Sequence, residues 1–584
     1  MAWPVGAMAA DVLAPIDLRQ IKVGGEMGRR IDVTIDNNLL VLKADQDFLA
    51  PFRAKKARDG YIGLGKLIDA AVRFAAYTKD ARVLALKKHL VDETIKTQEP
   101  DGYMGVMEAP ARISGMWDIC ELGYVILGLT SDYHYFGEKR SLAAARKAAD
   151  YLVAHWSTIP ADWPQQTHVA THVSVTGLER AMLLLSQETG DERYRNFCTR
   201  ERALPAWDLG IVIGRRDLIE GHVYAYVARC LAQLELFRFL PDPQLLRPTR
   251  RAVHFLTAED GMAITGGAGL WEIWTDDQDG RMALGETCAT AYQIRLYDSL
   301  LRLEGNSRYG DLVERTMYNA LFAAQSVDGR RIRYYTPLEG NREYFPADTY
   351  CCPCNYRRIV ADLPTMVYYR SSRGVAVSLY TPSEATIALD RGLSLKIRQN
   401  TDYPTSGRVV IRLDPSRPAR FPLQLRIPRW CDKPAVAVNG QPWGKSPAPG
   451  TFLCLDRQWQ AGDRVTLDLP MPWRLVLGRK RQAGRAAVMR GPLVFCLNPA
   501  QNKALAKRDA ADLGLLKLDP SSLKDVHGTD CCHLRAWDAG CMAVGVPGNL
   551  SLRLSVFPDP EGKTVFFCLP DLKAAVPDEL VGQE

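Results

Sequence analysis

The chain has 584 residues, of which 47% are hydrophobic and 24% are charged. At roughly 150 residues per domain this length predicts two to four domains, and the composition excludes a largely disordered or fibrous protein. The formal net charge of +7 is spread along the chain without basic runs, which argues against a nucleic-acid partner.

No uninterrupted apolar stretch of about 18 residues occurs, so we expect no transmembrane helix and no membrane partner. Residues 1–15 lack the basic start and the continuous apolar centre of a secretory signal. The protein is therefore expected in the cytoplasm, or in the periplasm if a signal has been removed. Fourteen cysteines are few for a disulfide scaffold, and the adjacent pairs Cys351-Cys352 and Cys531-Cys532 are awkward to bridge. A reducing compartment with a metal site fits them better.

Residues 61–370 are predicted to be helical. Apolar side chains recur there at helical spacing, as in the run Leu64, Leu67, Ile68, Ala71 and Ala75. Further segments of this kind begin near residues 82, 117, 141, 171, 192, 220, 250, 284, 308 and 356, mostly after short links with Gly, Pro, Asp or Asn. About twelve helices in consecutive pairs suit six hairpins closed into a ring, an (α/α)6 barrel within residues 1–370. An open helical solenoid would give a similar pattern, and we favour the ring.

From about residue 371 the period of the apolar pattern changes to two. The alternation is seen at residues 375–379, 393–397, 423–427 and 465–469. Turn signals such as Asn439-Gly440 and Gly462-Asp463 separate the strands, as they do in antiparallel β-sandwiches. The remaining length leaves room for two sandwich domains, which we place at residues 371–480 and 481–584, the second with a strand series that includes residues 552–556.

Two short segments of the helical half carry the densest chemical signal. They are residues 285–288, Gly-Glu-Thr-Cys, and residues 350–355, Tyr-Cys-Cys-Pro-Cys-Asn. Thiolates together with a carboxylate suggest zinc. Glu286 and Cys288 can both reach one ion only from a helix start or a loop, and Gly285 permits such a bend. The usual two separated Cys-x-x-Cys pairs are absent, so buried core cysteines are the alternative interpretation.

These motifs resemble those of glycoside hydrolase family 127, the β-L-arabinofuranosidase family, and its close relatives. The similarity runs from about residue 61 to residue 497, and Glu-Thr-Cys combined with Cys-Cys-Pro is its most specific part. It includes residues 98–103 (Gln-Glu-Pro-Asp-Gly-Tyr), 221–222 (Gly-His), 265–267 (Thr-Gly-Gly), 314–320 (Glu-Arg-Thr-Met-Tyr-Asn-Ala), 425–428 (Leu-Arg-Ile-Pro), 438–440 (Val-Asn-Gly) and 490–494 (Arg-Gly-Pro-Leu-Val). The resemblance implies a six-hairpin helical barrel followed by β-sandwich domains.

By matching motif, the resemblance implies a zinc ion held by Glu286, Cys288, Cys351 and Cys352, with Cys351 as the nucleophile. A zinc-bound thiol is deprotonated near neutral pH, whereas a free cysteine with a pKa of about 8.5 is only partly so. The thiolate can attack the anomeric carbon as the carboxylate of a retaining glycosidase does, and water then resolves the thioglycosyl intermediate. The configuration of the sugar would be retained.

Glu272 is the general acid and base that the resemblance implies, because the related enzymes carry theirs just upstream of the zinc glutamate. Its neighbours Trp271 and Trp274 would raise the pKa of its carboxyl by desolvation and offer a surface for a sugar ring. The spacing to Glu286 is slightly shorter than expected for the family. A solvated glutamate between two packing aromatic side chains is the alternative.

His222 stands at the start of a helical run and matches a substrate-contacting histidine of the family, with a core or capping histidine as the alternative. A second sugar-binding histidine of the family falls at Gly123 in this chain. This departure leaves the exact sugar open, because polar groups of the pocket set sugar specificity. Asp118 or Glu121 could replace the missing group.

Two further features stand beside the predicted site. Cys354 departs from the family pattern, either as a spare thiol or as a competing ligand that frees a neighbouring cysteine for chemistry. Tyr335, with Tyr334 and Trp274, could stack on a sugar, although aromatic residues at this density are more often core residues.

The sequence therefore predicts a zinc-dependent, retaining, exo-acting glycoside hydrolase with a β-L-arabinofuranoside or a related furanoside as substrate. One alternative is a hydrolase for another uncommon plant-type sugar on the same barrel. The other is a carbohydrate-binding protein with a structural zinc, against which Glu272 beside a thiolate cluster argues. A carbohydrate is the expected partner, and a homo-oligomer formed through the sandwiches is left open.

Overall fold

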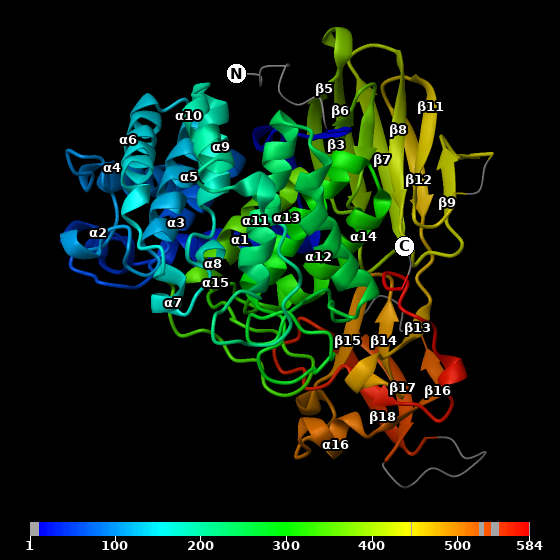
Figure 1. Ribbon diagram of the computed structural model, residues 1–584. Helices are drawn as coiled ribbons and strands as arrows, with labels where there is room; N and C mark the ends of the chain where they lie inside the picture. Colours follow the sequence, from blue (N-terminus) through cyan, green and yellow to red (C-terminus); the bar gives the residue numbers. More distant parts are fainter. Residues whose placement is uncertain (1–10, 445–446, 525–530, 539–547, 583–584) are drawn as a thin grey trace.

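The computed structural model describes residues 11–444, 447–524, 531–538 and 548–582. A helical half, drawn from blue to green in Figure 1, stands beside a β-sandwich in yellow, and a smaller β-domain in orange and red lies below both. The helices of the described residues are all too short or too polar to span a bilayer.

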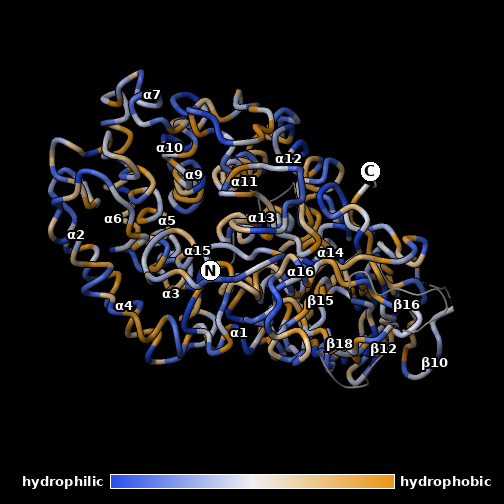
Figure 2. Tube along the Cα trace, turned by 90° about the horizontal axis from the view of Figure 1, so that it is seen from below, coloured by the Kyte–Doolittle hydropathy of each residue, from blue (hydrophilic) through white to orange (hydrophobic). Residues whose placement is uncertain are grey.

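Six helices form an inner ring, each packed against the next, and the last packs against the first. They are α3 (Leu64–Thr78), α5 (Asp118–Phe136), α9 (Leu178–Thr189), α11 (Val223–Phe239), α13 (Thr287–Glu304) and α15 (Cys351–Asp362). Seen from below, these helices surround a common centre (Figure 2). The contact between α15 and α3 closes the barrel and confirms the predicted ring over the open solenoid.

A second set of helices covers the ring from outside. It consists of α4 (Ala81–Lys96), α6 (Lys139–His155), α10 (Glu192–Thr199), α12 (Arg247–Ala258), α14 (Ser307–Thr316) and α1 (Gly25–Asn37), with the short helices α2 (Ala50–Ala54), α7 (Trp163–Thr167), α8 (Thr171–Ser174) and α16 (Ala510–Gly514) elsewhere. Asp80, Asp191 and Asn306 cap three of these helices by accepting a backbone N–H of the first turn. The sixth outer helix, α1, packs on α15 and was not predicted.

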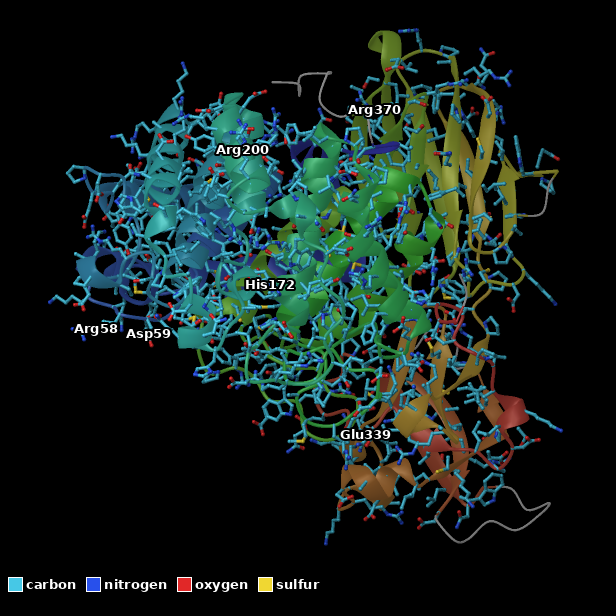
Figure 3. All side chains as sticks on the ribbon, in the orientation of Figure 1. Arg58, Asp59, His172, Arg200, Glu339 and Arg370 are labelled. Atoms are coloured by element: carbon cyan, nitrogen blue, oxygen red, sulfur yellow. The ribbon has the colours of Figure 1, made fainter. Side chains whose placement is uncertain are left out.

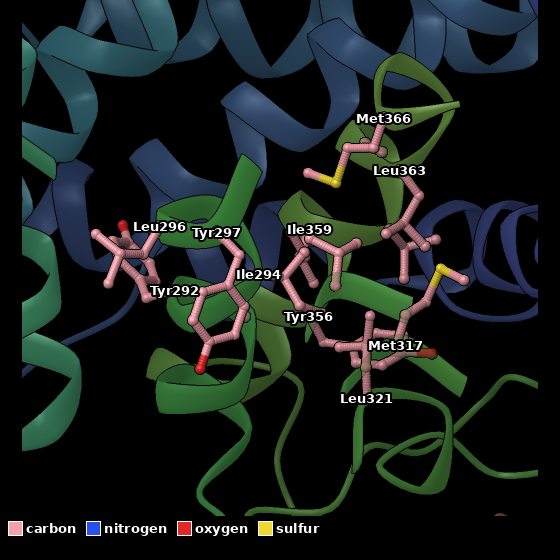
Figure 4. Packing of buried hydrophobic residues seen from close by; sticks show 14 of the residues in the cluster. Tyr292, Ile294, Leu296, Tyr297, Met317, Leu321, Tyr356, Ile359, Leu363 and Met366 are labelled. Carbon is pink, nitrogen blue, oxygen red and sulfur yellow. The ribbon is translucent and has the colours of Figure 1, made fainter. Parts of the chain in front are cut away.

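The inner helices approach one another closely where glycine replaces a side chain. A Cβ at Gly65 of α3 would lie 2.1 Å from the carbonyl carbon of Tyr124 in α5, so the two backbones are in direct contact. Larger side chains fill the rest of the interior. Figure 4 shows Ile294 of α13 near Tyr356 and Ile359 of α15, with Met317 of the π-helical turn that follows α14 beside them.

Two sheets form the β-sandwich. The five-stranded sheet has the order β1 (Leu13–Pro15), β3 (Tyr368–Ser371), β4 (Val375–Val377), β8 (Ala419–Ile427), β11 (Thr451–Trp459). The seven-stranded sheet has the order β10 (Gln441–Pro442), β9 (Ala435–Val438), β12 (Asp463–Asp468), β7 (Arg408–Pro415), β6 (Ser394–Thr401), β5 (Ser383–Ala388), β2 (Ile21–Val23). Residues 13–23 thus extend both sheets, whereas the sequence assigned residues 1–370 to the barrel.

The last sheet has the order β13 (Trp473–Leu477), β14 (Arg485–Arg490), β15 (Leu493–Leu497), β18 (Leu550–Val556), β17 (Cys531–Trp537), β16 (Lys517–Lys524), β19 (Phe566–Cys568). Strand β19 pairs with β14 as well as with β16, so the sheet closes on itself. Because β13 already belongs to it, this domain begins near residue 473, before the predicted start at residue 481.

Ion pairs join the barrel to both β-domains. Arg426 of β8 is 0% exposed and contacts Asp311 and Glu314 of α14, the latter at 2.5 Å. Glu339, labelled in Figure 3, lies in the loop before α15 and pairs with Arg485 of β14 at 2.7 Å. The loop that precedes α15 is therefore anchored against the last sheet.

Candidate active site

The predicted site residues gather at one end of the barrel, where α13 and α15 begin. The long loops before these helices form that end, shown in green above the last sheet in Figure 1. Glu286 is the residue that caps α13, and Cys351 is the first residue of α15. The two segments singled out in the sequence, some 60 residues apart in the chain, thus meet as neighbouring helix starts.

The structure brings Glu286, Cys288, Cys351 and Cys352 together, and one ligand atom of each lies within 4.8 Å of all the others. Cys288 Sγ and Cys352 Sγ are 3.2 Å apart, and the Cys351 and Cys352 sulfurs are 4.0 Å apart. The Cys352 thiol donates to Glu286 Oε1 at 3.6 Å. We call these four residues the ligand group.

Local backbone geometry sets the position of both halves of the ligand group. Gly285 has a φ of 69°, a left-handed conformation that glycine adopts without steric cost, and it turns the chain into α13. The Thr287 N–H then donates to the Tyr334 carbonyl at 2.8 Å, which fixes this helix start to the neighbouring loop. Before α15, Tyr350 has φ 87° and ψ 176°, and its N–H donates to the Ile62 carbonyl at 3.0 Å.

Burial and contacts within the ligand group raise the pKa of three ligands and lower the pKa of the fourth. Burial raises the pKa values of Glu286, Cys288 and Cys352 well above their usual range. Burial also acts to raise the pKa of Cys351, but hydrogen bonds from the two neighbouring thiols outweigh it and hold this pKa well below the usual value. Cys351 is partly exposed whereas the other three are buried, so the most acidic thiol is also the accessible one.

The donor set of the ligand group fits a zinc ion. Glu286 Oε2 is buried and has no hydrogen-bond partner among the described residues, which leaves a free acceptor beside three thiols. A carboxylate and thiolates within reach of one point are the ligand types that zinc takes. Asn355, one helical turn into α15, donates to Cys288 Sγ at 3.1 Å and so orients that ligand.

Glu272 lies beside the ligand group. The Tyr334 hydroxyl donates to Glu272 Oε1 and is 3.4 Å from Cys351 Sγ, so one hydroxyl joins the predicted acid/base to the predicted nucleophile. The other oxygen, Oε2, is 3.8 Å from His222 Nε2 and 3.8 Å from Arg215 Nη2. The backbone at Glu272 is left-handed, with a φ of 71°. This arrangement aims the carboxyl toward the thiols.

His222 stands directly before α11 with a side chain that is 13% exposed. Burial lowers the pKa of its imidazole, so the ring is neutral at neutral pH. Its Nδ1 is buried without a hydrogen-bond partner among the described residues. A neutral imidazole beside Glu272 can accept or donate a hydrogen bond to a sugar hydroxyl.

The predicted aromatic contacts divide into two groups. Trp271 is 50% exposed and stands edge-on to Tyr335, with ring centroids 6.0 Å apart. Trp274 is 0% exposed and packs edge-on against Tyr226 and Phe255. The prediction that Trp274 offers a surface to a sugar is therefore wrong, because its ring is enclosed in the core.

Gly123, where a family histidine was expected, does not face the ligand group. A Cβ at this position would lie 3.1 Å from Leu178 Cα, so Gly123 permits the contact between α5 and α9. Asp118 accepts from the Tyr103 hydroxyl and the Ile113 N–H, and Glu121 accepts from the backbone N–H groups of residues 62 and 63. Both carboxyls are buried and accept hydrogen bonds from the protein itself, while Glu121 Oε2 has no hydrogen-bond partner among the described residues.

Cys354 lies outside the ligand group. Its sulfur is 3.6 Å from Arg357 Nη1, and burial raises its pKa to about 11. Sequence reasoning also missed the bridging role of the Tyr334 hydroxyl and the contact of Asn355 with Cys288. Helical spacing could have found the second, since residue 355 is one turn beyond the first cysteines of α15.

Comparisons with known proteins agree with this geometry. The profile of the β-L-arabinofuranosidase catalytic domain of glycoside hydrolase family 127 matches residues 33–365, and that of the family's middle domain matches residues 374–471. A non-reducing end β-L-arabinofuranosidase of Bifidobacterium longum subsp. longum is 26% identical over 75% of each chain.

Two solved structures share the fold. A family 127 β-arabinofuranosidase has a TM-score of 0.79 at 20% identity and covers 97% of this chain and 99% of its own. A family 127 β-L-arabinofuranosidase of Geobacillus stearothermophilus T6 has a TM-score of 0.76 at 22% identity and covers 94% of this chain and 100% of its own. At these identities the likeness concerns the fold alone.

Proposed function

Because the chain belongs to glycoside hydrolase family 127, it is a glycoside hydrolase, and we propose that it releases L-arabinofuranose from the non-reducing end of β-linked substrates with retention of configuration. The observation that carries this proposal is the triangle of Cys351, Tyr334 and Glu272. One partly exposed thiol and one carboxyl meet at a single hydroxyl, with the remaining ligands buried behind the thiol.

Cys351 is the proposed nucleophile. In the first step its thiolate attacks the anomeric carbon, a carbon–sulfur bond forms, and the glycosidic carbon–oxygen bond breaks. Its low pKa supplies the thiolate, and the Tyr334 hydroxyl at 3.4 Å can hold the sulfur in place during the attack. The other ligands, Glu286, Cys288 and Cys352, would hold a zinc ion, which keeps its sulfur ligands deprotonated when bound.

Glu272 is the proposed acid and base. As an acid it gives its proton to the departing glycosidic oxygen, and as a base it then takes a proton from the water that displaces the sulfur. The Tyr334 hydroxyl donates to one of its oxygens, and His222 Nε2 lies 3.8 Å from the other. Trp271 and Tyr335 offer the exposed aromatic surface on which the sugar ring would rest.

The test is intact-protein mass spectrometry with zinc quantification after incubation with an activated β-L-arabinofuranoside and a panel of other glycosides. Wild type is compared with Cys351→Ser, Glu272→Gln and Cys354→Ser. The last is the matched control, since Cys354 is a buried thiol on the same helix outside the ligand group. We expect one zinc per chain, a sugar adduct that accumulates in Glu272→Gln, none in Cys351→Ser, and wild-type behaviour in Cys354→Ser.

Three outcomes would contradict parts of this scheme. Absence of zinc from the wild type would refute the assignment of the ligand group. An adduct that persists in Cys351→Ser would refute the nucleophile. Turnover of another glycoside in preference to the arabinofuranoside would refute the sugar while leaving the roles of Cys351 and Glu272 intact.

A further inference from the structure

A buried lysine lies at the end of the barrel that carries the thiols. Lys66, in the first turn of α3, is 0% exposed. Its ammonium donates to the Tyr224 hydroxyl at 2.9 Å and lies 4.3 Å from the ring centroid of Tyr124, 4.9 Å from that of Tyr224 and 5.0 Å from that of Tyr61. Ring faces and one hydroxyl replace the water that this cation would otherwise bind.

In the part of the chain that the structure describes, no carboxylate forms an ion pair with Lys66. The comparison with Lys87 is instructive, because that lysine is also buried but pairs with Asp132 at 2.8 Å. An ammonium without a counter-charge is costly to bury. We therefore expect a negative charge slightly further away that offsets the cost of burying this ammonium.

The ligand group supplies such a charge. The start of α3 touches the start of α15, since a Cβ at Gly63 would lie 2.8 Å from Cys354 Sγ and 3.5 Å from the carbonyl oxygen of Tyr350. Lys66 follows Gly63 by one turn, and Cys351 follows Tyr350 directly. Three thiolates and a carboxylate around a divalent ion would carry two net negative charges.

We propose that Lys66 is the buried counter-cation of the ligand group and that its charge strengthens zinc binding there. The inference rests on the proposed zinc site and deepens it. Lys66 is a positioning residue. Three tyrosines enclose its ammonium, so it would act on a bound zinc ion through its charge and without direct contact.

Glu121 is the competing partner for this charge. Its carboxyl is 0% exposed and holds the N–H groups of Ile62 and Gly63, at the same start of α3. If Lys66 served only to offset Glu121, removal of both charges together would restore zinc binding. A double variant therefore separates the two interpretations.

The experiment measures zinc affinity by competition with a chromogenic chelator, on the full-length protein with circular dichroism as a check of folding. Lys66→Met is expected to bind zinc about 10- to 100-fold more weakly, the range found when a group that supports metal ligands is removed. Lys66→Arg keeps the charge and is expected to stay close to wild type. Lys87→Met is the matched control, and its affinity should be unchanged.

Wild-type affinity in a folded Lys66→Met would overturn the proposal, as would restored affinity in Lys66→Met combined with Glu121→Gln. If Lys66→Met does not fold, Lys66→Gln replaces it in the test, because glutamine keeps a hydrogen-bond donor for Tyr224. Its zinc affinity relative to wild type is then interpreted in the same way. A wild type that takes up no zinc would overturn the proposed zinc site together with this inference. A wild type that binds zinc, with no loss in the lysine variants, overturns this inference alone.

Discussion

Replacing Tyr350 by glycine should make the protein more stable than replacing it by alanine. The φ of 87° and ψ of 176° at Tyr350 lie in a region that only glycine adopts freely, and a side chain there costs about 1–3 kcal/mol. Both substitutions remove the ring, including its edge-on contact with Tyr61 at 5.7 Å, so that loss cancels in the comparison. What remains is the cost of a Cβ in this backbone conformation.

The expected difference follows from two opposing terms. Alanine keeps the backbone cost of about 1–3 kcal/mol, whereas glycine loses about 0.4–1 kcal/mol because its unfolded chain is more flexible. The free energy of unfolding should therefore favour Tyr350→Gly by roughly 1 kcal/mol, and by at most about 2.6 kcal/mol. The relaxed loop should also place Cys351 less firmly, so Tyr350→Gly should have the lower kcat of the two.

Urea unfolding at a fixed zinc concentration measures the difference in stability, and initial rates on an activated arabinofuranoside measure the second effect. If Tyr350→Ala proves the more stable variant by several tenths of a kcal/mol, as it would at an ordinary backbone position, the reasoning about stored strain is refuted.

Arg426→Met should lower the free energy of unfolding by about 3–5 kcal/mol, because two buried carboxylates of α14 lose their partner. Arg420→Met, at the exposed end of the same strand, should change it by less than about 0.5 kcal/mol. Similar urea midpoints for the two variants would contradict this. Burial raises the pKa of Glu121 from 4.5 to about 7, so the stability that its protonated form provides is complete below about pH 4.5 and is lost as the pH rises to 7. Glu121→Gln should therefore lose less stability than wild type between pH 5 and pH 8, by up to roughly 3 kcal/mol, and parallel pH profiles would count against this assignment. Gly65→Ala places a Cβ 2.1 Å from the backbone of α5 and should cost at least about 1–3 kcal/mol, whereas Gly210→Ala, which meets nothing within 4 Å, should leave the melting temperature unchanged.

Local periodicity predicted most of the elements of the helical half, and contacts distant in sequence account for most of what it missed. The expected helix starts near residues 82 and 192 fall within one residue of α4 and α10. Helix α1 carries Met27, Ile31 and Ile35 on one face and could have been found in the same way. Its partner α15 and the pairing of β1 and β2 with sandwich strands could not, because nothing within residues 13–37 identifies surfaces formed more than 300 residues later.

The four ligands came from motif resemblance, and their meeting at two helix starts agrees with it. The burial of Lys66 could not be predicted from the sequence. A charged residue among apolar residues at helical spacing is expected on the solvent side of the helix. Only closure of the ring buries that side as well. The prediction that Trp274 contacts a sugar was wrong for a different reason. The left-handed backbone at Trp271 and Glu272 redirects the chain, so the next tryptophan enters the core although it is only two residues from the carboxyl.

The first segment of the chain has a consequence for the order of events during synthesis. Residues 13–23 supply an edge strand to each sandwich sheet, and α1 covers the helix that begins with Cys351. Their partner strands and α15 leave the ribosome only after about residue 350, although residues 13–23 also contact α3 and α13, which are made earlier. Strands β1 and β2 must therefore wait with their pairing groups unused until the sandwich strands emerge, and a barrel severed from the sandwich would lack the strands that pair with them. The helical and β halves are therefore linked by strands that precede the barrel in the sequence and pair after it.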